Sequence, residues 1–124
     1  MPTSPDAAAK SAFAAGNYEE AARLYSALLE RRPDATEQRH LLLCNRSAAL
    51  MKMSRFEEAA NDARAAIETA PEGFVKAHYR LACALRGGGD YASALAECDR
   101  ALQIRPGNDQ IQALREACVA CRCS

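Results

Sequence analysis

The sequence predicts an all-α protein: a right-handed α-solenoid of three tandem helix-turn-helix hairpins followed by a C-terminal capping helix, seven helices in total. Three observations lead to this prediction. A short motif of a turn, an aromatic residue and an alanine occurs three times. Each copy is closed by a proline at the same distance, and only 6% of the 124 residues are aromatic while alanine is frequent. Alanine-rich segments with few aromatics favour close-packed helices over β-sheets.

The repeated motif ends in an alanine three residues after its aromatic residue. Its copies are Gly16–Ala21, Ser54–Ala59 and Gly89–Ala94. The aromatics lie 38 and 35 residues apart, and Pro33, Pro71 and Pro106 each follow their aromatic by 15 residues. A period near about 34 residues is typical of stacked helical hairpins, and proline ends a helix because it lacks an N–H group. We therefore expect the three alanines to lie where paired helices cross.

The helix boundaries follow from the motif and from capping signals. The first helices of the hairpins are expected at about 5–15, 37–52 and 74–87, the second helices at about 18–31, 56–69 and 91–104, and the capping helix at about 109–121. Ser4 before Pro5 is a typical helix start, and Asn108 caps the last helix. Two further starts resemble capping boxes: Asn17 with Glu20, and Asp34 with Glu37.

Residues 2–106 resemble the tetratricopeptide repeat family. The resemblance lies in the repeat period and in the positions of the aromatic residue, the alanine and the proline in each copy. The resemblance implies a single domain over residues 1–124, with repeats at about 2–36, 40–73 and 75–108 and the capping helix at about 109–121. Ala63 and Cys98 stand where the first repeat has Tyr25, a departure that concerns packing details. The capping helix is expected to cover the apolar face that the third repeat leaves exposed.

The composition argues against several classes of partner. Lys plus Arg and Asp plus Glu number 16 each, so the formal net charge is zero, and neither nucleic acid nor a membrane is expected as a partner. No apolar run approaches the roughly 18 residues of a membrane span, and the N-terminus lacks a secretory signal pattern. Cys44, Cys83 and Cys98 lie among Ala and Leu in predicted helices, so we expect buried free thiols in a reduced, cytoplasmic protein.

Catalytic and metal-binding patterns are not visible in the sequence. His40 and His78 have no Cys or Asp at nucleophile spacing. Gly87–Gly89 predicts a flexible turn, since a phosphate loop needs further spaced glycines and a Lys. The C-x-x-C-x-C tail lacks a visible fourth ligand for zinc, so we expect a packed thiol at Cys118 and a frayed tail from Cys121 onward. The sequence therefore predicts a binding module and not an enzyme, with no cofactor and no metal.

The strongest functional signal is a set of polar residues on the first helices of the hairpins. These helices line the concave groove of such a stack, so polar residues on their inner faces point at a ligand. Lys76 and Arg80 are four residues apart and therefore share a helix face. Asn45 occupies the position in the second repeat that matches Arg80 in the third. Two cations and an amide converging on one groove predict a site for a carboxylate or an acidic peptide.

The segments Asn45–Ala49 and Lys76–Arg80 resemble the two-carboxylate clamp of co-chaperone tetratricopeptide domains. In that family, the clamp grips the C-terminal Glu-Glu-Val-Asp tail of the seventy- and ninety-kilodalton heat-shock chaperones. The resemblance implies that Asn45 and Lys76 hold the terminal carboxylates. It also implies that Arg80 meets a side-chain carboxylate or a backbone carbonyl of the peptide.

The first repeat departs from the clamp pattern. Where clamp domains carry a Lys and, four residues later, an Asn, this chain has Asp6 and Lys10. We expect Lys10 to take part in peptide binding, one turn away from the missing Lys. Asp6 is favoured in the first helical turn by the helix dipole, and it lies four residues before Lys10, the favoured orientation for a helical ion pair. Partial neutralisation of Lys10 by Asp6 is therefore the alternative.

Two functional hypotheses follow from the sequence. The first is a co-chaperone or adaptor domain that binds the acidic C-terminal peptide of a heat-shock chaperone or of another acidic-tailed protein. The second is a tetratricopeptide scaffold that binds a different protein without carboxylate recognition, through its convex or capping surface. The two hypotheses differ in whether a free C-terminal carboxylate on the partner is required.

Overall fold

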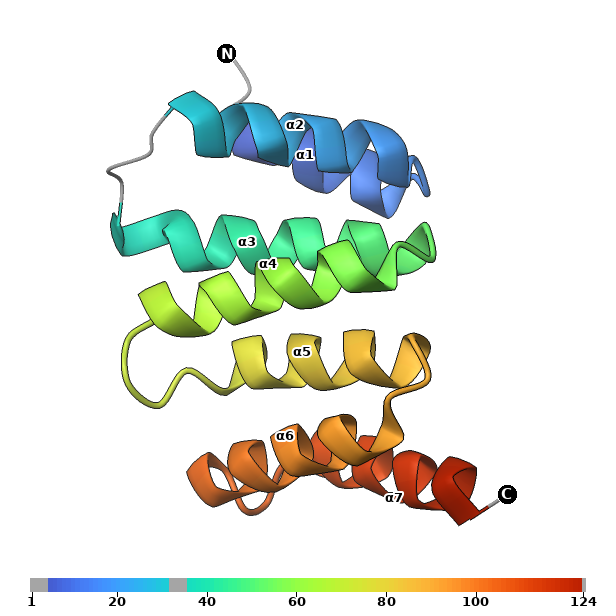
Figure 1. Cartoon of the computed structure of the whole chain (residues 1–124). Helices are drawn as coiled ribbons and strands as arrows, with labels where there is room; N and C mark the ends of the chain where they lie inside the picture. Colours follow the sequence, from blue (N-terminus) through green and yellow to red (C-terminus); the bar gives the residue numbers. More distant parts are fainter. Residues whose placement is uncertain (1–4, 32–35, 124) are drawn as a thin grey trace.

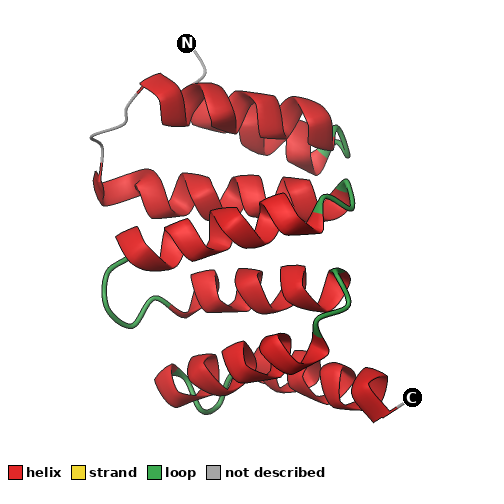
Figure 2. Ribbon diagram, in the orientation of Figure 1, coloured by secondary structure: helices red, strands yellow, loops and turns green. Residues whose placement is uncertain are grey.

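The computed structural model describes residues 5–31 and 36–123. Within these ranges the chain forms seven helices joined by turns and contains no β-strand (Figure 2). The helices are α1 (Pro5–Ala14), α2 (Tyr18–Arg31), α3 (Thr36–Lys52), α4 (Phe56–Thr69), α5 (Val75–Gly87), α6 (Tyr91–Ile104) and α7 (Asp109–Cys123). The predicted all-α fold class is confirmed, and every helix end lies within two residues of its prediction. None of the described helices is long and apolar enough to cross a membrane.

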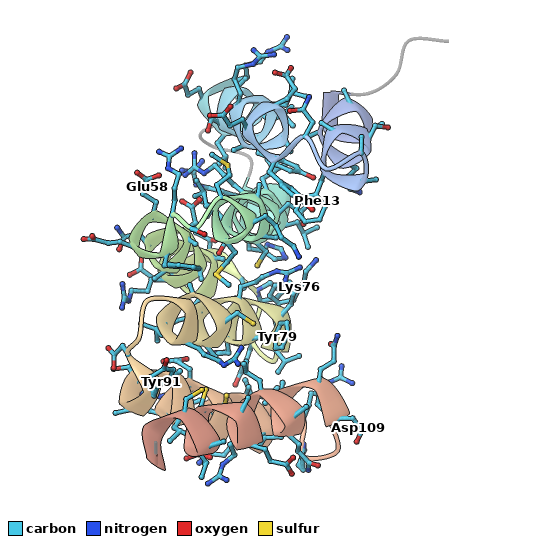
Figure 3. All side chains as sticks on the ribbon, turned by 90° about the vertical axis from the view of Figure 1, so that its right-hand side faces the viewer. Phe13, Glu58, Lys76, Tyr79, Tyr91 and Asp109 are labelled. Carbon is cyan, nitrogen blue, oxygen red and sulfur yellow. The ribbon has the colours of Figure 1, made fainter. Side chains whose placement is uncertain are left out.

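The helices are stacked as antiparallel hairpins (Figure 1). α1 pairs with α2, α3 with α4 and α5 with α6, while α7 packs against α6. Helices that are not consecutive in the sequence also touch: α3 contacts α5, and α5 contacts α7. In Figure 3, α1 and α3 lie on one side of the stack and α2 and α4 on the other. The odd-numbered helices therefore form the inner side, where the groove was predicted.

Small and apolar side chains fill the interfaces between the helices. Ala21, Ala59 and Ala94 are fully buried, as predicted from their place in the motif. A methyl group at each of these positions lets the paired helix backbones approach closely. On α7, Ile111 and Leu114 join the same apolar cluster as the second and third hairpins. The capping helix thus covers the apolar face of the third repeat, in agreement with the prediction.

Among the described residues, two helix starts are capped by a side chain, and one predicted cap is wrong. The Asn108 side chain accepts the N–H of Ile111 at 3.1 Å, as predicted, and Asp90 caps α6 by accepting the N–H of Ser93 at 3.2 Å. The capping box of Asn17 with Glu20 does not form. The Asn17 N–H donates to the Ala12 carbonyl at 2.8 Å, while the Glu20 carboxylate binds Arg23. The hairpin turn already satisfies the donor that a capping box needs. The Ser4 cap and the pair Asp34 and Glu37 lie outside the described residues and side chains.

The glycine run after the third inner helix has two distinct roles. Gly87 is the last residue of α5, and a Cβ atom added there would lie 2.4 Å from Cε1 of Phe56. Gly87 belongs to the helix, as the predicted range 74–87 has it, so the flexible turn predicted over Gly87–Gly89 is limited to its last two residues. The Phe56 ring occupies the space that a side chain at Gly87 would need. Gly89 has a φ of +89°, a left-handed conformation that glycine adopts without strain. The turn itself begins at Gly88.

The cysteine predictions are partly confirmed. Cys44 and Cys98 are fully buried thiols, but Cys83 is only partly buried at the edge of the cluster that it packs against. The frayed tail is wrong, since α7 continues as a helix through Cys121 to its end. Cys118 is fully buried, as expected for a packed thiol. The described residues contain no group of three or more His, Cys, Asp or Glu side chains arranged to hold a metal ion.

Candidate functional site

Two consecutive residues on α3 hold this helix at a defined rotation. Arg46 donates from Nε and Nη2 to the two carboxylate oxygens of Asp62 on α4, at 2.7 and 2.6 Å, and from Nη1 to Ser26 Oγ on α2 at 3.2 Å. The Ser47 hydroxyl is fully buried and donates to the Ala59 carbonyl on α4 at 2.8 Å. Successive helical side chains are about 100° apart. With Arg46 and Ser47 tied to the outer helices, Asn45 is directed toward the inner side.

Three of the four predicted site residues meet in one cavity on the inner side. The cavity encloses about 190 Å³, and its lining consists of Lys10, Phe13, Tyr25, Asn45, Ala48 and Arg80. Lys10 comes from α1, Asn45 from α3 and Arg80 from α5, so each of the three hairpins contributes one polar residue. Two cationic side chains and one amide face an apolar floor. This combination suits an anion that carries a small apolar group.

Arg80 has an unused hydrogen-bond donor in this cavity. Its Nε atom is buried and has no partner among the described residues. The guanidinium carbon lies 5.9 Å from the centre of the Tyr79 ring, which holds the side chain by a cation–π contact. A buried donor without an acceptor costs about 1–3 kcal/mol. An anionic acceptor entering the cavity removes this cost, and it also gains a charge-assisted hydrogen bond.

Lys76 lies one turn before Arg80 on α5 and is not part of the cavity lining. Figure 3 shows it on the same side of the stack as Phe13. Its charge reaches the second hairpin: burial raises the pKa of the Cys44 thiol, while Lys76 and then Arg80 act to lower that pKa. Both cations therefore act electrostatically on α3. Lys76 extends the positive site beyond the cavity along α5.

The model of the tetratricopeptide repeat family matches residues 7–41 and 44–109. This chain belongs to the tetratricopeptide repeat family. It is 38% identical over 102 residues to the "Hsp70-Hsp90 organizing protein" of Triticum aestivum, an alignment that covers 82% of the chain and 17% of that relative. The chain therefore spans less than a fifth of this relative's length.

Two solved structures are close in fold to this tetratricopeptide repeat domain. The second TPR domain of human RPAP3, in complex with an HSP70 peptide, has a TM-score of 0.83 and 27% sequence identity, with 93% of this chain and 92% of that chain covered. The TPR2B domain of yeast Sti1, in complex with an Hsp70 peptide, has a TM-score of 0.78 and 30% identity, with 90% of each chain covered. Both similarities extend over nearly the whole solenoid.

A second and larger cavity of the tetratricopeptide repeat domain lies between α2, α3 and α4 and encloses about 730 Å³. Its three arginines each have an acidic partner: Arg23 with Glu20, Arg46 with Asp62, and Arg55 with Glu58. Figure 3 shows Glu58 on the side opposite Lys76. Because these charges satisfy one another, the larger cavity offers an anion less than the smaller one does. We therefore place the candidate site on the inner side.

Sequence reasoning did not identify the apolar lining of the site. Phe13 follows Lys10 by three residues, and Ala48 follows Asn45 by three, so helical spacing alone could have located both. Tyr25 comes from an outer helix and is 2% exposed, and nothing in the sequence sets it apart from a core aromatic. The Asp6 side chain lies outside the described side chains. Whether it meets Lys10 therefore stays a prediction.

Proposed function

We propose that this tetratricopeptide repeat domain binds the acidic C-terminal peptide of a partner protein, as a co-chaperone or adaptor in the cytoplasm. The preferred peptide is of the Glu-Glu-Val-Asp type carried by heat-shock chaperones of the seventy- or ninety-kilodalton class. The observation that carries the proposal is the inner cavity where Lys10, Asn45 and Arg80 converge, with a buried and unpartnered donor on Arg80. The peptide complexes of the RPAP3 and Sti1 domains support it. A catalytic role is not part of the proposal.

The residues have distinct roles in the proposed complex. The Asn45 amide donates to the terminal carboxylate, and the Lys76 ammonium approaches the same group from α5. Arg80 donates from Nε to a side-chain carboxylate or backbone carbonyl of the peptide, and Lys10 closes the cavity from α1. Hydrogen bonds between charged groups are about 2.7–2.9 Å long and roughly twice as strong as neutral ones. A cavity of about 190 Å³ fits the end of one peptide chain and not a larger ligand.

Amidation of the peptide is expected to abolish much of the binding. The full chain is titrated by calorimetry with a peptide ending in Glu-Glu-Val-Asp and with the same peptide carrying a C-terminal amide. Loss of the terminal charge removes charge-assisted hydrogen bonds, so we expect an affinity lower by about 10- to 150-fold. Equal affinities would contradict carboxylate recognition. That result would favour a scaffold that binds a different protein.

Replacement of the first-repeat pair is expected to strengthen peptide binding. The double variant Asp6→Lys and Lys10→Asn exchanges an acid and a cation for a cation and an amide. The gain of one positive charge beside the groove should improve affinity about five- to thirty-fold at low salt, roughly 1–2 kcal/mol, with a smaller gain as salt rises.

A matched variant controls for net charge in this comparison. Glu57→Gln also adds one positive charge, but Glu57 is exposed on α4, on the outer side. It should leave peptide affinity unchanged. If the double variant binds no better than Glu57→Gln, the native Asp6 and Lys10 pair is irrelevant to this ligand or suited to a different one. A peptide with a cation near its end is then the next ligand to titrate.

A further inference from the structure

The outer helices of the second and third repeats, α4 and α6, each carry a buried carboxylate at the same position in the repeat. Asp62 lies six residues after Phe56, and Glu97 lies six residues after Tyr91. The two acids are 7% and 6% exposed, whereas the first repeat has Leu24 at this position. A buried charge is costly unless it is paired and hydrogen-bonded. The partner of each carboxylate therefore shows which neighbouring helix it holds.

The partner of Glu97 on the neighbouring helix is His78. Nδ1 of His78 on α5 lies 2.9 Å from Oε2 of Glu97 on α6, and the two side chains are 18% and 7% exposed. Glu97 also forms an ion pair with the exposed Arg100 on its own helix. An ionised carboxylate only accepts hydrogen bonds, so His78 is the donor. Glu97 thus ties α5 to α6, as Asp62 ties α3 to α4 through Arg46.

His78 lies on the face of α5 opposite to the two cations of the candidate site. It is two residues from Lys76 and two from Arg80. Because successive residues of an α-helix are about 100° apart, His78 is about 160° around the helix from each of them. Arg80 lines the inner cavity, and Figure 3 shows Lys76 on the same side of the stack as Phe13. With His78 bound to α6, both cations are directed away from α6 and toward the inner side.

The apolar face of α5 constrains its rotation less than a hydrogen bond does. The buried residues of this helix are Ala77, Leu81, Ala82, Ala84 and Leu85. Three of these five are alanines, and a methyl group interlocks less with a facing helix than a longer side chain does. A hydrogen bond is directional, because it weakens steeply as its angle departs from linear. The bond between His78 and Glu97 therefore adds a constraint on rotation that the alanines do not supply.

We propose that His78 and Glu97 are positioning residues for the anion site, because their hydrogen bond sets the rotation of α5 that directs Lys76 and Arg80 at the peptide. This role rests on the proposed function, since it concerns the same groove. The pair itself does not contact the peptide. It acts through α5, by keeping the buried Nε of Arg80 in the cavity. Loss of the pair should therefore weaken peptide binding although no contact with the peptide is removed.

The test breaks this hydrogen bond and then restores it in the full chain. His78→Leu removes the donor, and the affinity for a Glu-Glu-Val-Asp peptide, measured by calorimetry, should fall by about two- to thirty-fold. His78→Asn places an amide N–H near the position of Nδ1 and should restore most of the affinity. Ile111→Val removes a methylene group from the buried face of α7 and so lowers stability without touching the pair. This control should bind as the parent does, and urea denaturation measures the stability of each variant.

A second readout needs no peptide. Because Nε of Arg80 is buried, its N–H group should exchange slowly with water in NMR spectra of the unbound chain. Exchange should become faster in His78→Leu and slow again in His78→Asn. In an Arg80→Ala background, His78→Leu should reduce the peptide affinity by a smaller factor than in the parent, since residues that act through one group are not additive.

The outcomes separate this role from the proposed function. If the parent binds free and amidated peptides equally, the carboxylate site is wrong, and the exchange rate of Arg80 alone decides whether the pair sets the rotation of α5. If His78→Leu is less stable but keeps the parent's affinity and exchange rate, the pair only stabilises the fold and the proposal is wrong. A loss of affinity that His78→Asn does not restore also overturns it. If circular dichroism shows that His78→Leu is unfolded, Glu97→Met removes the same hydrogen bond from α6 and takes its place.

Discussion

Arg80→Ala should bind a Glu-Glu-Val-Asp peptide about 10- to 150-fold more weakly than the parent chain, a loss of roughly 1.5–3 kcal/mol measured by calorimetry. The substitution removes the buried Nε donor that has no partner among the described residues. It also removes one of the two cations that line the inner cavity. Folding should be little affected, because in the unbound chain this donor has no hydrogen bond to lose and only the cation–π contact with Tyr79 is removed.

Three further variants test whether the loss of peptide affinity is specific to residues of the groove. Lys76→Ala should lose a similar amount, and Asn45→Ala less, about 0.5–1.5 kcal/mol, because its amide is neutral. Arg64→Ala removes the same charge from an exposed position on α4 and should bind as the parent does. If the three groove variants match Arg64→Ala, the carboxylate site is not where we place it. The scaffold hypothesis then becomes the better account.

Asp62→Ala is expected to lower the free energy of unfolding by about 2–3 kcal/mol, as measured by urea denaturation. Asp62 accepts two hydrogen bonds from Arg46, and the two side chains are 10% and 26% exposed. The Asp62 carboxylate also holds the pKa of Arg46 above its usual value. Without it, a largely buried guanidinium keeps only the Ser26 hydroxyl at 3.2 Å as a described partner.

The control for this prediction is an ion pair of the same type at the surface. Glu58→Ala breaks the ion pair between Glu58, which is 53% exposed, and Arg55, which is 50% exposed. This substitution should lower the free energy of unfolding by at most about 1 kcal/mol. Asp62→Ala should also weaken peptide binding, because Arg46 holds the rotation of α3 that directs Asn45 inward. If Asp62→Ala proves as stable as Glu58→Ala, the ion pair between Arg46 on α3 and Asp62 on α4 does not stabilise the fold.

Much of the candidate site could be predicted from local spacing. Lys76 and Arg80 share a helix face because they are four residues apart, and Asn45 reaches the same groove because the repeats are equivalent. The hairpin period made both inferences possible. The apolar part of the cavity was not predicted, since Tyr25 enters it from an outer helix and reads as an ordinary core residue. The Arg46–Asp62 pair, 16 residues apart on two helices, was missed for the same reason.

The sequence by itself determined the seven helices, their ends and the fold class of this protein. These depend on local patterns: aromatic, alanine and proline at a fixed period, and Asn108 before the last helix. Only the tertiary structure decided which side chains meet across helices. It placed the Phe56 ring where a side chain of Gly87 would be, left Cys83 only partly buried, and buried Cys98 and Cys118 in the same apolar cluster. Such contacts depend on how each helix is rotated against its neighbours, and that rotation is set by packing and not by local spacing.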